Sequence, residues 1–155
     1  MTDEVVTDAV DHTPGAIIVD EYLADFSIEN PGGRVPADQA PELVLGLDVA
    51  VHAAALAGAT DATHGVQIVL GMPARLGDRV IFLIEMRYQV NVKLQGVDEA
   101  DISELLYVQI PEAVFPTLKA IVEKNGAFAG YPGVVLFPID FAAIFHSRMQ
   151  ELTQA

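Results

Sequence analysis

The residues that could support catalysis or bind a metal are scattered along this chain. No histidine has a second one at the spacing that places two metal ligands on one helix face; the four are His12, His52, His64 and His146. The chain has no cysteine, so no disulfide and no thiolate metal site can form. No serine lies in a nucleophile or phosphate-loop motif. We therefore expect no metal, no cofactor and no enzyme activity.

Carboxylates are the one set of chemical groups with regular spacing. Glu21, Asp25 and Glu29 share one parity of a strand-like segment, and Glu85 has the same kind of position on a later segment. General acid–base chemistry needs a carboxylate whose pKa is shifted by burial, and nothing in this pattern indicates burial. Two interpretations stay open: a solubilising face, or a docking surface for a basic partner.

The composition is both acidic and apolar. With 22 Asp and Glu against 8 Lys and Arg, the formal net charge of the 155 residues is 8 − 22 = −14, yet 52% of residues are hydrophobic and the mean hydropathy is +0.37. So much apolar surface predicts a subunit interface or a binding groove. The charge excludes binding to a nucleic-acid backbone.

No membrane insertion and no secretion signal are expected. The longest uncharged stretch, 125–139, contains glycines and prolines and is shorter than the ~20 residues of a membrane helix. The N-terminus is acidic and lacks the basic region of a signal peptide. We interpret residues 1–15 as an acidic mobile tail and 16–155 as a single domain.

Hydrophobic periodicity predicts the elements of that domain. Alternation of apolar and polar residues predicts strands near 17–29, 43–52, 66–73 and 79–94. The period then changes, and apolar residues at spacings of three and four predict a long helix from Asp98 to a stop at Gly126 and a short helix over 139–152. Strands followed by helices indicate an α+β fold with a four-stranded antiparallel sheet, a long helix and a short C-terminal helix.

Two details of the pattern bear on the shape of the molecule. Pro111 and Pro116 lie inside the long helix and predict a break or kink. Phe82, Ile84, Met86 and Tyr88 share one face of the fourth strand, which indicates either core plus a dimer interface or a groove for an apolar polypeptide.

Several of these segments resemble one known family. The run Tyr22-Leu23-Ala24-Asp25-Phe26-Ser27-Ile28-Glu29-Asn30-Pro31 is similar to the first strand of the bacterial protein-export chaperone SecB, and Phe82-Leu83-Ile84-Glu85 is similar to its fourth. Pro111 and Phe115-Pro116 match the proline-punctuated long helix of that family. Gly130-Tyr131-Pro132 and Pro138-Ile139-Asp140-Phe141 resemble its C-terminal signature. The likeness extends from about residue 17 to 150.

The resemblance implies an ATP-independent cytoplasmic chaperone that holds unfolded preproteins and delivers them to the translocase motor ATPase, SecA. It implies a homotetramer in which edge strands pair protomers and long helices pair dimers. By motif position it assigns Asp25, Glu29 and Glu85 to the motor. Phe82 carries over as an aromatic residue of the client groove, with Ile84, Met86 and Tyr88 as neighbours on its face.

The chain also departs from the family pattern. Gln39 replaces a tryptophan that usually precedes the second strand, and Val90-Asn91-Val92 replaces a glycine-aromatic run. These departures leave open a chaperone dedicated to one partner, such as an antitoxin, or another non-enzymatic interaction protein.

Overall fold

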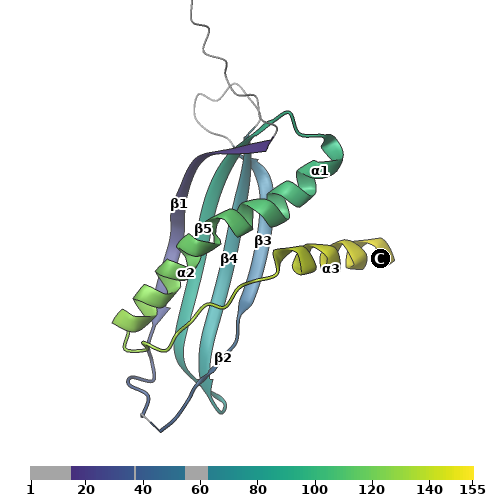
Figure 1. Ribbon diagram of the computed structural model, residues 1–155. Coiled ribbons are helices and arrows are strands. Elements are labelled where there is room, and N and C mark those ends of the chain that lie inside the picture. The colour runs from purple at the N-terminus through teal and green to yellow at the C-terminus, as the bar shows by residue number, and fades with distance from the viewer. Residues whose placement is uncertain (1–14, 37, 55–62) are drawn as a thin grey trace, which may run out of the picture.

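An antiparallel sheet forms the body of the protein, and helices cross one of its faces (Figure 1). The structure is a computed structural model that describes residues 15–36, 38–54 and 63–155. The strands are β1 (Gly15–Glu29), β2 (Glu42–Leu43), β3 (Gly46–Ala54), β4 (Thr63–Leu76) and β5 (Arg79–Gln95). Their order is β1-β5-β4, and both β2 and β3 pair with the far side of β4. The predicted α+β class with an antiparallel sheet is confirmed.

The predicted second strand is divided in two. β2 and β3 are separated by Val44 and Leu45, which lie between the two ladders formed with β4. Both halves pair with β4, and the amide of Val44 donates to the carbonyl of Pro73 at 3.1 Å. Over the residues that the structure describes, the sheet thus has five strands, although its course is the one that the pattern predicted.

The alternation predicted for β5 matches its burial over residues 82–88, whereas Ile81, Gln89 and Asn91 of the other parity are also buried. Phe82, Ile84, Met86 and Tyr88 are buried under the helices, while Glu85 and Arg87 are exposed on the opposite face. Because residues paired in register share a face, β4 adds its own alternate side chains to the same core. We call the helix-bearing side of the sheet the covered face and the other side the open face.

Two β-bulges make the parity prediction for β1 wrong between them, over residues 20–23, whereas Ile18, Phe26 and Ile28 share the covered face as predicted. The register advances two residues on β1 against one on β5 at Val19 and again at Ala24. Each extra residue reverses the faces of the side chains beyond it. Glu21 therefore pairs with Val90 on the covered face, and Tyr22 pairs with Gln89 on the open face. Both assignments are the reverse of the simple alternation.

The long helix is continuous past its first proline. It comprises α1 (Glu99–Glu104), the π-helical turn η1 (Leu105–Gln109) and α2 (Ile110–Phe128). A proline cannot donate the hydrogen bond that its position requires, and the wider π turn ends at Gln109, two residues before Pro111. The expected break is thus a local widening, and Pro116 lies within the helix.

The helix ends at Phe128, two residues beyond the predicted stop. Gly130 has φ +95°, and the amide of Tyr131 donates to the carbonyl of Gly126 at 2.9 Å. A side chain on Gly126 would place its Cβ only 3.0 Å from Cβ of Val134. The predicted stop signal is therefore a site of close packing, and Gly130 makes the turn.

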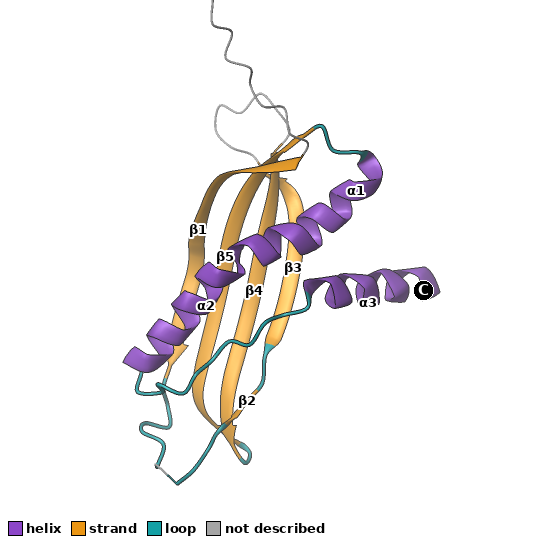
Figure 2. Cartoon of the chain, viewed as in Figure 1, coloured by secondary structure: helices purple, strands orange, loops and turns teal. Residues whose placement is uncertain are grey.

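An extended segment, residues 129–140, runs back from α2 to the C-terminal helix α3 (Phe141–Gln154); Figure 2 shows it as the loop that crosses in front of the strands. We call it the strap. Asp140 is the N-cap of α3, and its side chain accepts from the amide of Ala143 at 2.9 Å. The predicted terminal helix is confirmed.

By length and composition alone, the helix Glu99–Phe128 could span a membrane. Its buried side chains, which include Val114, Leu118 and Val122, instead belong to the core formed with the sheet. Of the expected N-terminal tail, Gly15 already pairs with Gln95 in the sheet. The rest of that tail lies outside the described residues.

Candidate functional site

The three carboxylates assigned to a partner lie on the open face. Asp25 pairs in register with Arg87, Glu29 with Leu83, and Glu85 with Ser27. The β5 residues of these three pairs, Arg87, Leu83 and Glu85, occupy the alternate positions that point away from the helices. The structure thus brings Asp25, Glu29 and Glu85 together, because the register from Asp25 to Glu29 is continuous and contains no bulge.

One arginine modifies the charge of this face. Nη2 of Arg87 lies 3.2 Å from Oδ2 of Asp25, and both side chains are more than half exposed. An exposed pair of this kind adds little stability. Glu85, by contrast, makes no ion pair with any described residue. A shallow hollow of about 250 Å³ lies between Asp25, Glu85 and Gly71, where no side chain fills the surface.

A polar network crosses the open face at its other end. Asn91 donates to Oδ1 of Asp20 at 2.6 Å, and Gln89 donates to Oδ1 of Asn91 at 3.0 Å. Gln67 of β4 lies 3.5 Å from Gln89, and His52 covers the backbone of Gly65. These amides use their hydrogen-bonding groups on one another, so the network joins β4, β5 and β1 rather than presenting a ligand site.

The four residues assigned to the client groove lie in the core. Phe82, Ile84, Met86 and Tyr88 are each less than 5% exposed. The ring of Phe82 contacts that of Tyr131 with centroids 4.6 Å apart. Burial raises the pKa of Tyr88 to about 12, and a hydrogen bond to Glu21 adds to this effect. Their role in client binding stays a prediction, because none of them reaches a surface of this protomer.

An apolar groove lies beside these buried residues. The strap forms one wall and the β2–β3 region forms the other, with Met72 of β4 between them. The groove has a volume of about 280 Å³, and it is lined by Leu43, Leu45, Met72, Val135, Leu136, Phe137, Pro138 and Ile139. Phe137 is 74% exposed, and Leu45 and Val135 are each 40% exposed. We call this the strap groove.

A second hollow continues from the first through Leu43. It measures about 470 Å³ and is lined by Val35, Pro36, Gln39, Ala40, Pro41, Leu43, Ala74, Gly130, Tyr131, Pro132, Gly133 and Val134. The hydroxyl of Tyr131 lies against the carbonyl of Gly33 and 3.2 Å from Oδ1 of Asn30. Asn30 in turn donates to the carbonyl of Ala129 at 2.8 Å. This network fixes the end of the strap against the β1–β2 connection.

Sequence reasoning missed both walls of the strap groove. The alternation of residues 43–52 predicted a single strand, and the Gly/Pro-rich run after Gly126 predicted only a loop. The available signal was the apolar run Val134-Val135-Leu136-Phe137 between Gly133 and Pro138. An apolar run in a connecting segment indicates contact with something apolar.

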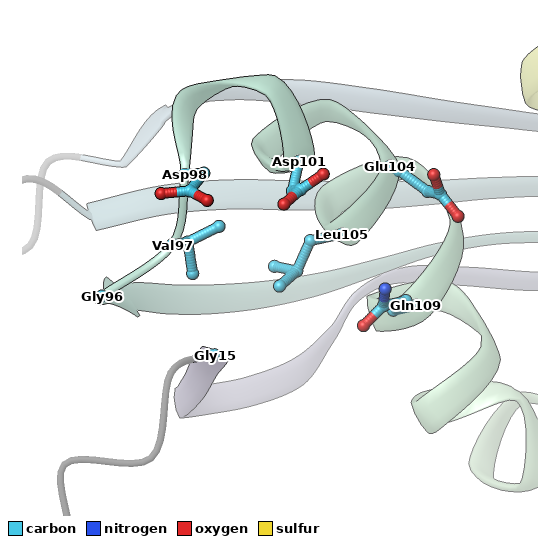
Figure 3. A pocket seen from close by; sticks show the side chains of 8 residues that line it. All are labelled: Gly15, Gly96, Val97, Asp98, Asp101, Glu104, Leu105 and Gln109. Atoms are coloured by element: carbon cyan, nitrogen blue, oxygen red, sulfur yellow. The ribbon is translucent and has the colours of Figure 1, made fainter.

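A further hollow is acidic. It lies where α1 follows β5, and Figure 3 shows Asp98, Asp101 and Glu104 around it, with Gln109 at one side. Within the described ranges, no group of three or more histidine, aspartate or glutamate side chains is arranged to hold a metal ion. Acidic residues in the first turn of α1 have a structural reason, because they complement the helix dipole.

Comparison with known proteins assigns this architecture to a family. The model of the family described as preprotein translocase subunit SecB matches residues 10–152. This chain belongs to the SecB family. The protein-export protein SecB of Hyphomonas neptunium is 29% identical over 91% of this chain and 82% of its own. The protein-export protein SecB of Sinorhizobium fredii is 31% identical over 89% of this chain and 82% of its own length.

A solved structure supports the fold. A SecB-like chaperone of Mycobacterium tuberculosis, determined in complex with a peptide from an antitoxin, superposes with a TM-score of 0.66. The superposition covers 81% of this chain and 91% of the M. tuberculosis chain, and the two sequences are 16% identical. The suspected SecB resemblance is thus confirmed at the level of family and fold.

Proposed function

We propose that this SecB family member is an ATP-independent chaperone that holds unfolded preproteins in an export-competent state and delivers them to SecA. The strap groove carries the proposal. Its lining is apolar, its two walls are segments of extended chain, and Phe137 is 74% exposed at its rim. Aliphatic and aromatic walls bind apolar side chains without selecting one sequence, as a holdase requires.

The four buried residues of β5 have a supporting place in this proposal. Met72 in the groove pairs in register with Ile84, and Ala74 in the second hollow pairs with Phe82. Ile84 and Phe82 are thus the neighbours, on the adjacent strand β5, of residues that line the two hollows. Met86 and Tyr88 continue the same row. We infer that this buried row packs beside Met72 and Ala74 and so keeps the floor of the two hollows in place.

The open face suits a basic partner. In a chain of net charge −14, Asp25, Glu29 and Glu85 lie on the sheet face that none of the described helices covers, and Arg87 lies beside them. Complementary charge favours encounter and correct orientation. We infer that SecA docks there, on the side of the sheet opposite the strap groove, so that client and motor bind at once.

Exposed apolar surface favours the homotetramer. β1 is an edge strand with exposed Ile17, Val19 and Leu23. At the opposite edge of the sheet, Nη1 of Arg148 donates to the carbonyl of Val49 of β3 at 3.0 Å, so α3 already uses a backbone acceptor of that edge strand. An open apolar edge favours pairing with another strand. The outward side of α2 carries small residues, including Ala120, that allow two helices to approach closely.

Aggregation of an unfolded client provides the test. Purified protein without nucleotide should suppress aggregation at one tetramer per client, and its native mass should be about 66 kDa, four times 16.6 kDa. Contacts repeated over four protomers give the avidity that single grooves lack. No suppression at equimolar tetramer would refute the chaperone. In this proposal the protein works in the cytoplasm.

A chaperone dedicated to one partner is the second candidate. The solved SecB-like chaperone was captured with an antitoxin peptide, and Gln39 makes the second hollow of this chain less apolar than a tryptophan would. Affinities for several unrelated unfolded proteins distinguish the two functions. Similar affinities support general export, whereas measurable binding of one stoichiometric partner alone supports a dedicated chaperone.

A further inference from the structure

The strap is fixed firmly at both of its ends. At its first end the buried ring of Tyr131 contacts Phe82, and its hydroxyl lies against the carbonyl of Gly33. At its second end Asp140 caps α3, and the next residue, Phe141, is buried. The conformation of the stretch between these anchors determines the shape of the groove wall.

One residue in this stretch is bound through its backbone to two charged side chains. The amide of Leu136 donates to Oε1 of Glu123 at 3.2 Å, and its carbonyl accepts from Nζ of Lys119 at 3.1 Å. Lys119 and Glu123 lie one turn apart on α2 and are paired with each other. Together they satisfy both polar groups of a single peptide residue, as a neighbouring strand would.

This contact determines which way the neighbouring side chains point. The side chain of Leu136 is buried in the core, whereas Val135 and Phe137 on either side of it are exposed and line the groove. Side chains alternate in direction along an extended chain. Holding Leu136 against α2 therefore turns Val135 and Phe137 away from the helix.

We infer that Lys119 and Glu123 are positioning residues for client binding: they hold Leu136 against α2 and so keep the strap wall of the groove preformed. The inference rests on the proposed chaperone function. A wall that is ordered before binding spares the client the loss of conformational entropy that ordering it would require. Without the pair, the middle of the strap keeps the packing of the buried side chains of Val134 and Leu136 but loses the two polar contacts of Leu136 with α2.

The charges of the pair support this role. The hydrogen bond from Lys119 lowers the pKa of Glu123, and the amide of Leu136 contributes to the same shift, while partial burial opposes it. The carboxylate is therefore ionised at neutral pH, where it is the stronger acceptor. A bond between a charged group and a backbone amide holds the strap better than a neutral one would.

Two measurements on the full chain test the inference. Lys119→Met combined with Glu123→Met removes both charges and both hydrogen-bonding groups while keeping similar side-chain lengths. Amide exchange of Leu136 should become about tenfold faster, because one lost hydrogen bond to a charged group corresponds to about that factor. The dissociation constant of an unfolded client should rise about fivefold, since its wall must then be ordered on binding.

Controls separate this role from general destabilisation. Arg79→Met with Glu151→Met makes the same charge change at exposed positions outside α2 and should alter neither quantity. Lys119→Arg alone keeps a donor and should retain most of the affinity. Amide exchange in β4 and β5 should stay unchanged in all variants, which shows that the fold is intact.

The outcomes are distinguishable. If the unmodified protein binds client, and the double variant leaves either Leu136 exchange or client affinity unchanged, the positioning role is wrong while the chaperone function stands. If β5 exchange accelerates as much as that of Leu136, the pair only stabilises the fold, which also overturns the role. If the unmodified protein binds no unfolded client, the proposed function itself fails, whatever the exchange rates are.

Discussion

The hydroxyl of Tyr88 donates a hydrogen bond of 3.1 Å to Oε1 of Glu21, from β5 to the edge strand β1. This contact exists only because Ala24 is an extra residue in β1, which moves Glu21 to the covered face. A buried phenol beside a carboxylate resists ionisation, because a second negative charge would lose solvation and face the first.

Tyr88 should therefore ionise near pH 12 rather than 10. Because its pKa is raised in the folded protein, its contribution to stability is complete below pH 10 and is lost as pH rises toward 12. Absorbance titration at alkaline pH, compared with Tyr88→Phe, measures this pKa among the four tyrosines. Glu21→Gln should lower it toward 10. Loss of an ionisation near pH 10 in Tyr88→Phe would contradict the prediction.

Gly32→Ala should destabilise the protein by about 1–3 kcal/mol. Its added Cβ would lie 2.7 Å from Cβ and 2.8 Å from Cα of Ile81, and the backbone cannot easily move away. Gly71→Ala is the matched control, since nothing lies within 4 Å of its Cβ, and it should change stability by less than about 1 kcal/mol. Denaturant unfolding measures both; equal effects would show that the clash is relieved.

Phe137→Ser should weaken the binding of an unfolded client about tenfold while leaving the unfolding midpoint nearly unchanged, because the side chain is 74% exposed at the groove. Phe128→Ser removes an equally exposed ring, at 79%, from the end of α2 and outside both apolar hollows. It should have little effect on client affinity. Similar losses in the two variants would indicate non-specific apolar binding rather than a groove.

Asp25→Arg combined with Glu85→Arg should abolish binding of SecA and leave client affinity intact, because the two surfaces lie on opposite faces of the sheet. Asp38→Arg with Asp78→Arg makes the same change of net charge in the connections between strands and is the control. Titration calorimetry with each partner separates the effects. Simultaneous loss of motor and client binding would count against separate surfaces.

Much of the fold followed from periodicity. Alternation over β5 predicted the buried row from Phe82 to Val92, though not the burial of Gln89 and Asn91, and the change of period after β5 predicted the long helix. Strand and helix periods are local properties, so they are legible without the tertiary structure. The common face of Asp25, Glu29 and Glu85 was predicted in the same way, because both bulges precede Asp25 and leave the register beyond it regular.

The groove could not be predicted in this way. Phe82 and its neighbours have the composition of a binding surface, but the helices and the strap bury them. The apolar side chains that reach the surface of the groove are those of Leu45, Val135 and Phe137. A local pattern states that a face is apolar, and only packing decides whether protein or solvent covers it.

By itself, the sequence determined an acidic, apolar α+β chain with a two-sided sheet and the motifs of one family. The tertiary structure decided how its residues are used. Two bulges reverse the side-chain faces in the middle of β1, and Gly126 packs against Val134. Lys119 and Glu123 of α2 bind the backbone of Leu136 in the strap. These pairings depend on register and long-range packing, which no spacing along the chain specifies.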